Sequence, residues 1–241
     1  MLEMKKQKFL ASSSMYKDKW LENIFNKNCY ITTNLKDIKF FKTLKNTFVF
    51  LKTKNKITKK SSIRNLKFID INNIYQKNIE KTYEYLNKKK ISYKTKLKKN
   101  EQKKVIKLAY SNFKFSRFHS DKRLSNLKAN LIKKKTLENF FLGKRGNKIF
   151  VQFYEGKISG FCLFIYERIY EARIDLICID KKFSRKGLAK DLIEYSIDCL
   201  KKANKKKVIV GTQEKNFASN KLYKSLKFIP KSKLFMYHYI S

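Results

Sequence analysis

The chain has 241 residues, a length that fits one large or two small globular domains. Hydrophobic residues make up 42% of it, enough for a core, while 6 glycines and 1 proline exclude collagen-like, proline-rich and linker-type chains. The net charge of +40, from 59 basic and 19 acidic residues, is compatible with binding to nucleic acid or to an anionic membrane.

The N-terminal part is predicted to mix strands with one helix, although residues 1–30 give no assignable pattern. Residues 47–53 are rich in β-branched and aromatic side chains and predict a strand, as do residues 66–71. Residues 73–90 carry apolar side chains at roughly helical spacing and predict a helix. Residues 91–97 alternate apolar and polar side chains, which is typical of a half-buried strand.

The charge-rich segment 96–104 predicts a domain boundary, with a smaller α/β domain over residues 1–102 and a second domain over 103–241. In the second domain, Glu155-Gly156 marks a tight turn between two strands. The expected helices are 103–112, 124–141, 187–203 and 216–226, and the expected strands are 148–154, 157–166, 172–180, 207–212 and 234–240. This order predicts a mixed α/β sheet, antiparallel in its first part, with a β–α–β unit over residues 172–212 whose strands are parallel.

The abundance of lysine has a simple source in codon usage. Lysines outnumber arginines 52 to 7, they are spread along the whole chain, and asparagine, isoleucine, phenylalanine and tyrosine are abundant too. These are the residues that AT-rich genomes over-supply. We therefore interpret the charge as a generally basic surface, with specific nucleic-acid binding as the alternative.

The cysteines and the apolar runs narrow the class of protein further. The four cysteines (Cys29, Cys162, Cys178, Cys199) form no C-x-x-C pair, which argues against a disulfide framework or a structural zinc site and suits a reducing compartment. The longest strongly apolar run, residues 161–166, is far shorter than the roughly 20 residues of a membrane-spanning helix. We expect a cytoplasmic protein without a metal, a signal peptide or membrane association.

Residues 177–192 contain the first motif that could bind a ligand. A buried strand leads into a short basic turn with Gly187, and a helix follows directly. The first turn of a helix offers free N–H groups and a partial positive charge, so it can hold a phosphate, and Arg185, Lys186 and Lys190 add charge. The alternative is an ordinary strand–loop–helix junction.

Residues 211–228 contain the second motif. Asn216 can cap a helix, and Tyr223 and Ser219 lie one turn apart on the flank of its inner face. A tyrosine hydroxyl on that flank can reach a ligand, although a tyrosine at the core edge with its hydroxyl in water is the alternative. The predicted inner face consists of Ala218, Leu222 and Leu226.

Together, in this order, the two motifs resemble the GNAT superfamily of N-acetyltransferases. The first reads Ser184-Arg-Lys-Gly187-Leu-Ala189, and the second reads Asn216-x-x-Ser219-x-x-Leu222-Tyr223-x-x-Leu226-Lys227-Phe228. The resemblance covers about residues 103–241. Ser184 replaces the usual glutamine or arginine, and Lys227 replaces the glycine that ends the helix, so Lys227 is expected to be strained if it is left-handed.

Residues 116–121, 156–161, 210–216 and 237–239 look like segments of amino-sugar acetyltransferases of the TDP-fucosamine acetyltransferase type. Those enzymes also carry a smaller α/β domain ahead of the catalytic one. The resemblance implies a GNAT-like sheet with a splayed parallel strand pair and acetyl transfer from acetyl-CoA to a primary amine. The expected acceptor is a nucleotide-linked amino sugar, with a protein N-terminus or a polyamine as the alternative acceptors. A non-catalytic nucleic-acid-binding module is the alternative to an enzyme. The resemblance is also compatible with a homodimer.

The resemblance also implies roles for individual residues. Tyr223 would protonate the departing thiolate, and the strand end would pair with the pantetheine arm while the turn binds the diphosphate. The implied cofactor-binding residues are Leu176, Ile177, Cys178, Ile179, Arg185, Lys186, Gly187, Leu188, Ala189, Lys190, Asn216 and Ser219. The implied acceptor-binding residues are Arg117, Phe118, His119, Asp121, Gln213 and His238.

No residue stands out as the general base. The candidates are His119, Glu171, Asp175 and His238. Either histidine can instead be a hydrogen-bonded structural residue. Arg117 suits a phosphate or carboxylate, and a structural Arg117–Asp121 salt bridge or a helix cap is the alternative.

Overall fold

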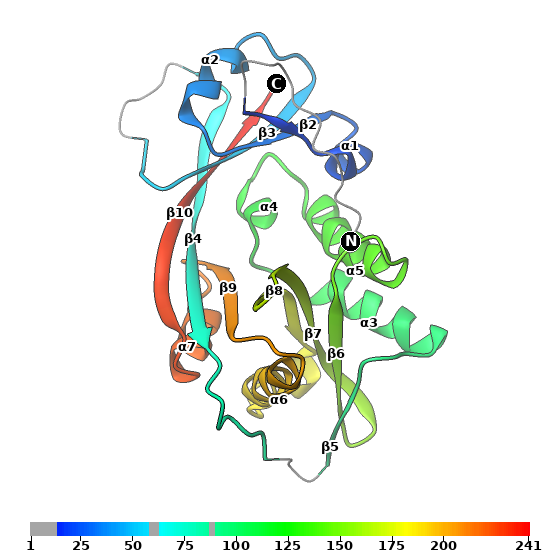
Figure 1. The fold of residues 1–241 in the computed structure, drawn as a ribbon. Helices are drawn as coiled ribbons and strands as arrows, with labels where there is room; N and C mark the ends of the chain where they lie inside the picture. Colours follow the sequence, from blue (N-terminus) through cyan, green and yellow to red (C-terminus); the bar gives the residue numbers. More distant parts are fainter. Residues whose placement is uncertain (1–13, 58–62, 87–89) are drawn as a thin grey trace.

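The computed structural model describes residues 14–57, 63–86 and 90–241, which form one ten-stranded sheet in the order β1-β2-β3-β10-β4-β9-β8-β7-β6-β5 (Figure 1). The strands are β1 Tyr16–Lys17, β2 Asn28–Thr32, β3 Thr47–Thr53, β4 Leu66–Asn78, β5 Ile91–Lys94, β6 Lys148–Tyr154, β7 Lys157–Arg168, β8 Glu171–Ile179, β9 Lys207–Gln213 and β10 Ile229–Ile240. The helices are α1 Lys19–Phe25, η1 Leu35–Asp37, α2 Ile38–Phe41, α3 Lys99–Asn112, α4 Arg117–Ser120, α5 Asn126–Phe141, η2 Lys181–Phe183, α6 Leu188–Lys202 and α7 Phe217–Ser225.

The predicted elements of the second half are confirmed. The helices and strands expected after residue 103 are present, with small shifts at their ends. The sheet is mixed and mostly antiparallel, with β8–β9 and β2–β3 as parallel pairs. At the turn between β6 and β7, Glu155 and Gly156 have φ values of 50° and 74°, the left-handed conformation that a type I′ hairpin turn requires.

The helix predicted over residues 73–90 is wrong for residues 73–86, and residues 87–89 lie outside the described residues. The strand β4 continues to Asn78 and lies between β10 and β9, with Tyr75 opposite Pro230 on one side and Val210 on the other. Because both edges of β4 find backbone partners, the sheet overrides the helical spacing of the apolar residues. The strand β4 is distant in sequence from both neighbours, and no local pattern announces such a pairing.

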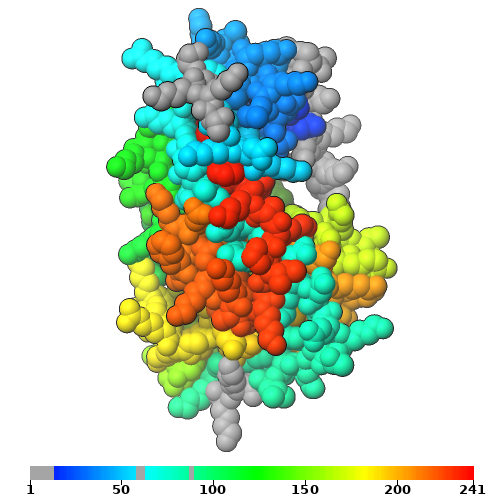
Figure 2. Space-filling model, turned by 90° about the vertical axis from the view of Figure 1, so that its left-hand side faces the viewer, coloured from blue at the N-terminus to red at the C-terminus, as the bar shows by residue number. Residues whose placement is uncertain are grey.

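The same strand bears on the domain division. The strands β4 and β5 both precede residue 103, yet β4 pairs with β9 and β10, and β5 pairs with β6. One sheet therefore runs across the expected boundary, and the division at residue 102 stays a prediction. Figure 2 shows the face on which β10 and α7 lie between the N-terminal elements above and α6 below.

Two apolar layers enclose the C-terminal part of the sheet. On one face, α6 and α7 pack on β7–β9 through residues that include Leu192, Ile197 and Tyr223. On the other face, α3 and α5 pack through Val105 and Leu137 (Figure 1).

All four cysteines, which lie in the described residues, are free. Across the described residues, the helices are too short or too polar to cross a membrane. The same residues contain no cluster of three or more His, Cys, Asp and Glu side chains arranged to hold a metal ion.

Candidate functional site

The parallel strands β8 and β9 part halfway along their length, as predicted. They pair from Glu171 with Lys207 to Ile174 with Val210, and no register pair follows. Beyond that point β8 stays paired with β7 up to Ile179, and β9 stays paired with β4 up to Gln213. The facing edges of β8 and β9 therefore carry backbone groups without a strand partner, and Gln213 lies at the end of the opened edge.

A β-bulge at Asp175 lies where the strands part. Leu163 of β7 pairs with Leu176 and Phe164 pairs with Ile174, so Asp175 is the extra residue. A bulge bends its strand and increases the local twist, which turns the end of β8 away from β9. The sequence analysis missed this feature, because one extra residue leaves little trace in an alternating pattern.

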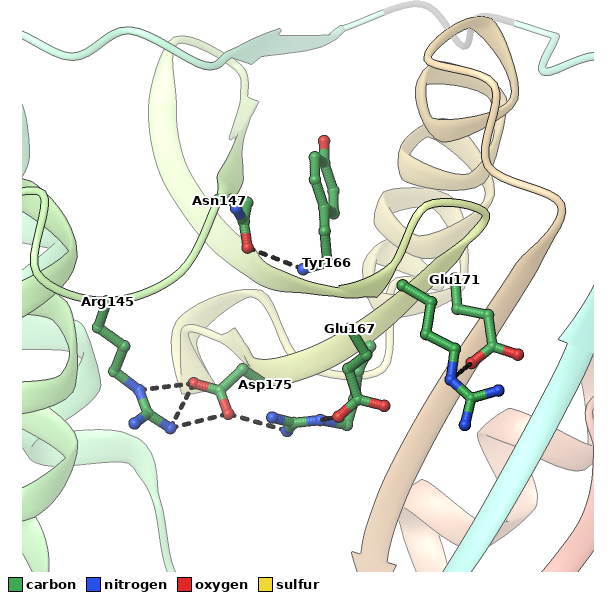
Figure 3. Close-up of polar contacts among 8 residues, drawn as sticks. Arg145, Asn147, Tyr166, Glu167, Glu171 and Asp175 are labelled. Carbon is green, nitrogen blue, oxygen red and sulfur yellow. Dashed lines mark hydrogen bonds and ion pairs between the residues drawn. The ribbon is translucent and has the colours of Figure 1, made fainter. Parts of the chain in front are cut away.

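Two arginines hold the Asp175 carboxylate (Figure 3). Arg145 donates from Nε and Nη2, each at 3.0 Å, and Arg173 donates from Nη1 at 3.0 Å. The Asp175 side chain is almost fully buried, and burial alone would raise its pKa, but the two guanidinium groups bring the pKa below its usual value. Asp175 is therefore ionised and engaged, which makes it a poor general base.

The backbone of β8 presents two N–H groups to the opening. The N–H of Asp180 donates to the carbonyl oxygen of Ser159 on β7 at 2.8 Å. Because successive N–H groups of a strand point to opposite sides, the N–H groups of Ile177 and Ile179 point toward β9. Only glycine fits at position 160, where an added Cβ would lie 2.6 Å from the carbonyl oxygen of Cys178, and this close approach seats β8 against β7.

The predicted phosphate-binding turn has the required free donors. Arg185 and Gly187 have left-handed φ values of 63° and 75°, and α6 starts at Leu188. Within the described part of the chain, the N–H groups of residues 185–190 donate no hydrogen bond. The space around Gly187 is open, because a Cβ there would have no neighbour within 4 Å. The turn therefore fits a diphosphate.

A buried polar network fixes the start of α6. The Asp191 carboxylate accepts from Tyr85 Oη at 2.9 Å, from Gln152 Nε2 at 3.0 Å and from Tyr93 Oη. Burial and the hydrogen bond to Asp191 raise the pKa of Tyr93 above its usual value. Gln152 also donates to the Leu188 carbonyl oxygen at 3.2 Å, which ties β6 to the first turn of the helix. The sequence signal for this network was an acidic residue on the buried face of α6.

Asn216 and Asn220 position α7. Asn216 caps the helix by accepting from the N–H of Ser219 at 3.3 Å, as predicted. Asn220, which the sequence analysis missed, accepts from Tyr75 Oη at 2.8 Å and donates to the Asn216 carbonyl oxygen at 2.8 Å. Ala218, predicted on the inner face, is exposed, because the helix turns Leu222, Tyr223 and Leu226 toward the core instead.

Tyr223 lies in the apolar cluster against which Ile177 and Ile179, on the opened edge of β8, also pack. Its side chain is 2% exposed and packs between the rings of Tyr75 and Phe228. Burial raises the pKa of its phenol above the usual value, and the Cys162 thiol is the nearby group that raises it further. Cys162 lies opposite Ile177 in the sheet, so the phenol lies near the part of β8 that has left β9. In the described residues its hydroxyl makes no hydrogen bond.

Four of the residues predicted to face the acceptor lie together, at a distance along β4 from Gln213: Arg117 stacks on Phe118, the Phe118 ring lies 5.8 Å from that of His238, and His238 contacts Asp121. Phe118 is buried in the core between α1, α5 and β3. His119 is held through both ring nitrogens, by Ser116 Oγ at 2.7 Å and Asn130 Oδ1 at 3.0 Å, and burial lowers its pKa. The structure thus supports the structural interpretation of His119.

Asp121 pairs with Arg123, not with Arg117, so the proposed Arg117–Asp121 salt bridge is wrong. Arg123 donates from Nη2 at 2.8 Å and Nε at 2.9 Å, since it follows Asp121 closely on the same turn. His238 Nδ1 lies 2.9 Å from Asp121 Oδ2, and burial lowers the pKa of this histidine to about 4.

Two of the base candidates lie far from the opening. In the sheet, His238 lies opposite Lys67 of β4, whereas Gln213 lies opposite Asn72. At about 3.4 Å per residue, the two positions are separated by about 17 Å along β4. Glu171 lies at the far end of β8, where Lys207 Nζ approaches it to 3.3 Å.

Comparisons with known proteins agree with this geometry. The model of the acetyltransferase (GNAT) family matches residues 113–228. The structure of a functionally unknown conserved protein from Staphylococcus epidermidis is similar over 100% of this chain and 96% of that chain, with a TM-score of 0.70 and 14% identity. The structure of a GCN5-related N-acetyltransferase from Kribbella flavida is similar over 88% of this chain and 81% of that chain, with a TM-score of 0.57 and 7% identity. At these identities the likeness concerns the fold alone, and no curated protein matches the sequence.

Proposed function

We propose that this chain transfers an acetyl group from acetyl-CoA to a primary amine on a small molecule, which its match to the acetyltransferase (GNAT) family model over residues 113–228 supports. The observation that carries the proposal is the parting of β8 from β9 after Ile174 and Val210, with Tyr223 in the apolar cluster against which Ile177 and Ile179 of β8 pack. Acetyl-CoA supplies the acetyl group as a thioester. The remaining steps fall to residues of this chain.

The turn before α6 and the free edge of β8 would hold the donor. The unpaired N–H groups of residues 185–190 would bind the diphosphate, and the Arg185 and Lys186 side chains would add positive charge. The N–H groups of Ile177 and Ile179 would pair with the extended arm as a neighbouring strand does. A donor such as the Ile177 N–H, aimed at the thioester oxygen, is worth about 2.7–4 kcal/mol at the transition state.

Tyr223 would give its proton to the departing thiolate. Its raised pKa keeps the phenol protonated at neutral pH, which is the form a general acid needs. The half-buried Ser219, one turn earlier on α7, would leave room for the sulfur. The side chain of Asn216 is engaged as a helix cap, so its contribution to donor binding would be to place the start of α7.

We propose a nucleotide-linked amino sugar as the acceptor, in a reducing, cytoplasmic setting. The strongly basic surface favours anionic acceptors over cationic ones such as polyamines. The free state of all four cysteines supports a reducing compartment.

A thiol-release assay with acetyl-CoA tests the proposal, using nucleotide-linked amino sugars, free amino sugars, polyamines and peptide N-termini as acceptors. We expect turnover with an amino sugar and little with a polyamine. Turnover with polyamines or peptides alone would overturn the acceptor class. Absence of donor binding, together with tight and steeply salt-dependent binding of RNA, would overturn the enzyme itself.

A further inference from the structure

Arg117 is half-buried and carries a positive charge that, in the described residues, no carboxylate approaches to ion-pair distance, although the charge of Asp18 acts on it. Its Cζ lies 3.9 Å from the ring centre of Phe50 and 4.2 Å from that of Phe118, so the guanidinium is stacked between two aromatic rings. In the described residues its buried Nε has no hydrogen-bond partner, and no carboxylate forms an ion pair with it. Burial lowers the pKa of this guanidinium to about 10. A buried charge left unpaired is costly, which points to a missing anion.

Lys133 and Trp20 lie in the same region and also lack acceptors. The Lys133 ammonium, on α5, lies 4.9 Å from the ring centre of Phe113 and makes no hydrogen bond or ion pair across residues 14–57, 63–86 and 90–241. Burial lowers its pKa to about 8, and Asp175, Arg117 and Arg145 are the charges that act on it most. The buried Trp20 Nε1 has no partner in the same ranges, and its ring lies 5.5 Å from Arg145 Cζ.

The carboxylates nearby are already committed. Asp175 accepts from Arg145 and Arg173, and Arg173 also contacts Glu167 (Figure 3). Asp18, the carboxylate whose charge acts most on Arg117, caps α1 by accepting from the Leu21 N–H at 3.0 Å. The cations Arg117, Lys133, Arg145 and Arg173 thus outnumber the carboxylates Asp18, Asp175 and Glu167.

We infer that Arg117, Lys133 and the Trp20 indole N–H form a binding site for an anionic group, a carboxylate or a phosphate, on the acceptor amine. The inference rests on the proposed function and adds the charge of the acceptor. Arginine and lysine are the side chains that bind such groups through charge-assisted hydrogen bonds, and a stacked guanidinium is held ready for them.

The Lys133 end of the site lies near the opened part of β8, whereas the Arg117 end lies over Phe50, which pairs with His238 in the sheet. The Lys133 ammonium lies over the Phe113 ring, and Phe113 packs against the cluster of Leu176 and Cys178 on the part of β8 that has left β9. Cys178 packs with the α3 and α5 layer, whereas Tyr223 packs with the α6 and α7 layer. An acceptor anchored at Arg117 and Lys133 would therefore approach the opening from the α5 face, opposite the phenol.

Binding of small anions tests the site without donor or turnover. Calorimetry would measure inorganic phosphate and succinate binding to the wild type, Arg117→Met and Lys133→Met, with Lys135→Met as the matched control on the exposed side of α5. Methionine keeps much of the stem that packs on Phe50 and Phe118. Phosphate is also expected to bind at the turn before α6. The binding that Arg185→Met loses measures this contribution, which is subtracted from the wild-type value.

We expect Arg117→Met and Lys133→Met to weaken anion binding about tenfold or more, and Lys135→Met to leave it unchanged. A preference for phosphate or for succinate identifies the anionic group. Equal binding by the wild type and Arg117→Met, or no binding to the wild type at millimolar anion, would overturn the inference.

Paired acceptors supply a second readout. Glucosamine 6-phosphate is compared with glucosamine, and β-alanine with β-alaninamide, for the wild type, Arg117→Met and Arg117→Lys. We expect Arg117→Met to raise KM for the charged member about tenfold or more with kcat retained, to leave the neutral member unchanged, and Arg117→Lys to recover part of the loss. Equal effects on both members would overturn the site. If none of the amines tested supports thiol release, the proposed function is overturned. The calorimetric measurement of anion binding would still test the anion site in that case.

Discussion

Ile174 and Val210 form the last register pair between the parallel strands β8 and β9. The next residue of β8, Asp175, is a bulge held by two arginines, and from there each strand keeps only its outer neighbour. The opening is thus built by one inserted residue and its ion pairs. The turn before α6 and the phenol of Tyr223 lie beside it, which is what makes this opening a site.

Removing the charge of Asp175 should loosen the bulge. Asp175→Asn keeps the size of the side chain but leaves Arg145 and Arg173 without their carboxylate, so we expect the free energy of unfolding to fall by about 2 kcal/mol. Urea unfolding measures this. Glu167→Gln removes a more exposed partner of Arg173 and should cost roughly 0.5 kcal/mol or less. Equal losses in both variants would show that the bulge does not depend on Asp175.

Tyr223→Phe should separate catalysis from donor binding. Without the hydroxyl the departing thiolate receives no proton from this position, so kcat should fall roughly 100-fold or more while donor affinity changes little. Steady-state thiol release and calorimetry with CoA measure the two quantities. Tyr75→Phe removes a neighbouring hydroxyl that is bound to Asn220 and should retain most of kcat. Full activity of Tyr223→Phe would contradict the role of Tyr223 as the general acid.

Lys227→Gly should raise the melting temperature. Lys227 is left-handed, with φ at 60°, and the N–H of Phe228 donates to the Tyr223 carbonyl oxygen at 3.0 Å, the pattern of a helix end that favours glycine. Relief of the left-handed strain should raise the free energy of unfolding by about 0.5–1 kcal/mol, after the greater flexibility of glycine in the unfolded chain has offset part of the gain. Calorimetric melting measures the shift, and Lys224→Gly, inside α7, should lower the melting temperature instead. No rise in Lys227→Gly would contradict the assigned strain.

His238 should make folding stability depend on pH. Burial lowers its pKa from 6.5 to about 4, so between these values the unfolded chain binds more protons than the folded one. This contribution is fully present above pH 6.5 and is lost as the pH falls toward 4, by about 2 kcal/mol between pH 7 and pH 5. Urea unfolding at both pH values should show this slope, and His238→Asn should flatten it. An unchanged slope would mean that another group titrates.

The sequence predicted the central unit of the site because its signals are local. A buried strand, a glycine turn and an amphipathic helix follow one another over residues 172–203, and the helix carrying Tyr223 comes soon after. What it could not predict involves partners distant in sequence. β4 enters the sheet between β9 and β10, Asp191 meets Tyr85 and Tyr93, and Arg117 stacks on Phe50.

The acceptor residues illustrate the same limit. His119 and His238 lie in segments that resemble the amino-sugar enzymes, yet one is held by Ser116 and Asn130 and the other lies about 17 Å along β4 from the opening. Lys133, one of many dispersed lysines, carried no sequence signal. Its half-buried position near Asp175 singles it out only once α5 is packed against the sheet.

Hydrogen exchange of the backbone amides with and without CoA tests the central claim most directly. If the opened edge of β8 and the turn before α6 bind the donor, saturating CoA should slow exchange in peptides covering residues 176–190. Exchange over residues 157–168 of β7, whose strand partners are already in place, should change little. Unchanged exchange over residues 176–190 at CoA concentrations that saturate the protein would contradict the account.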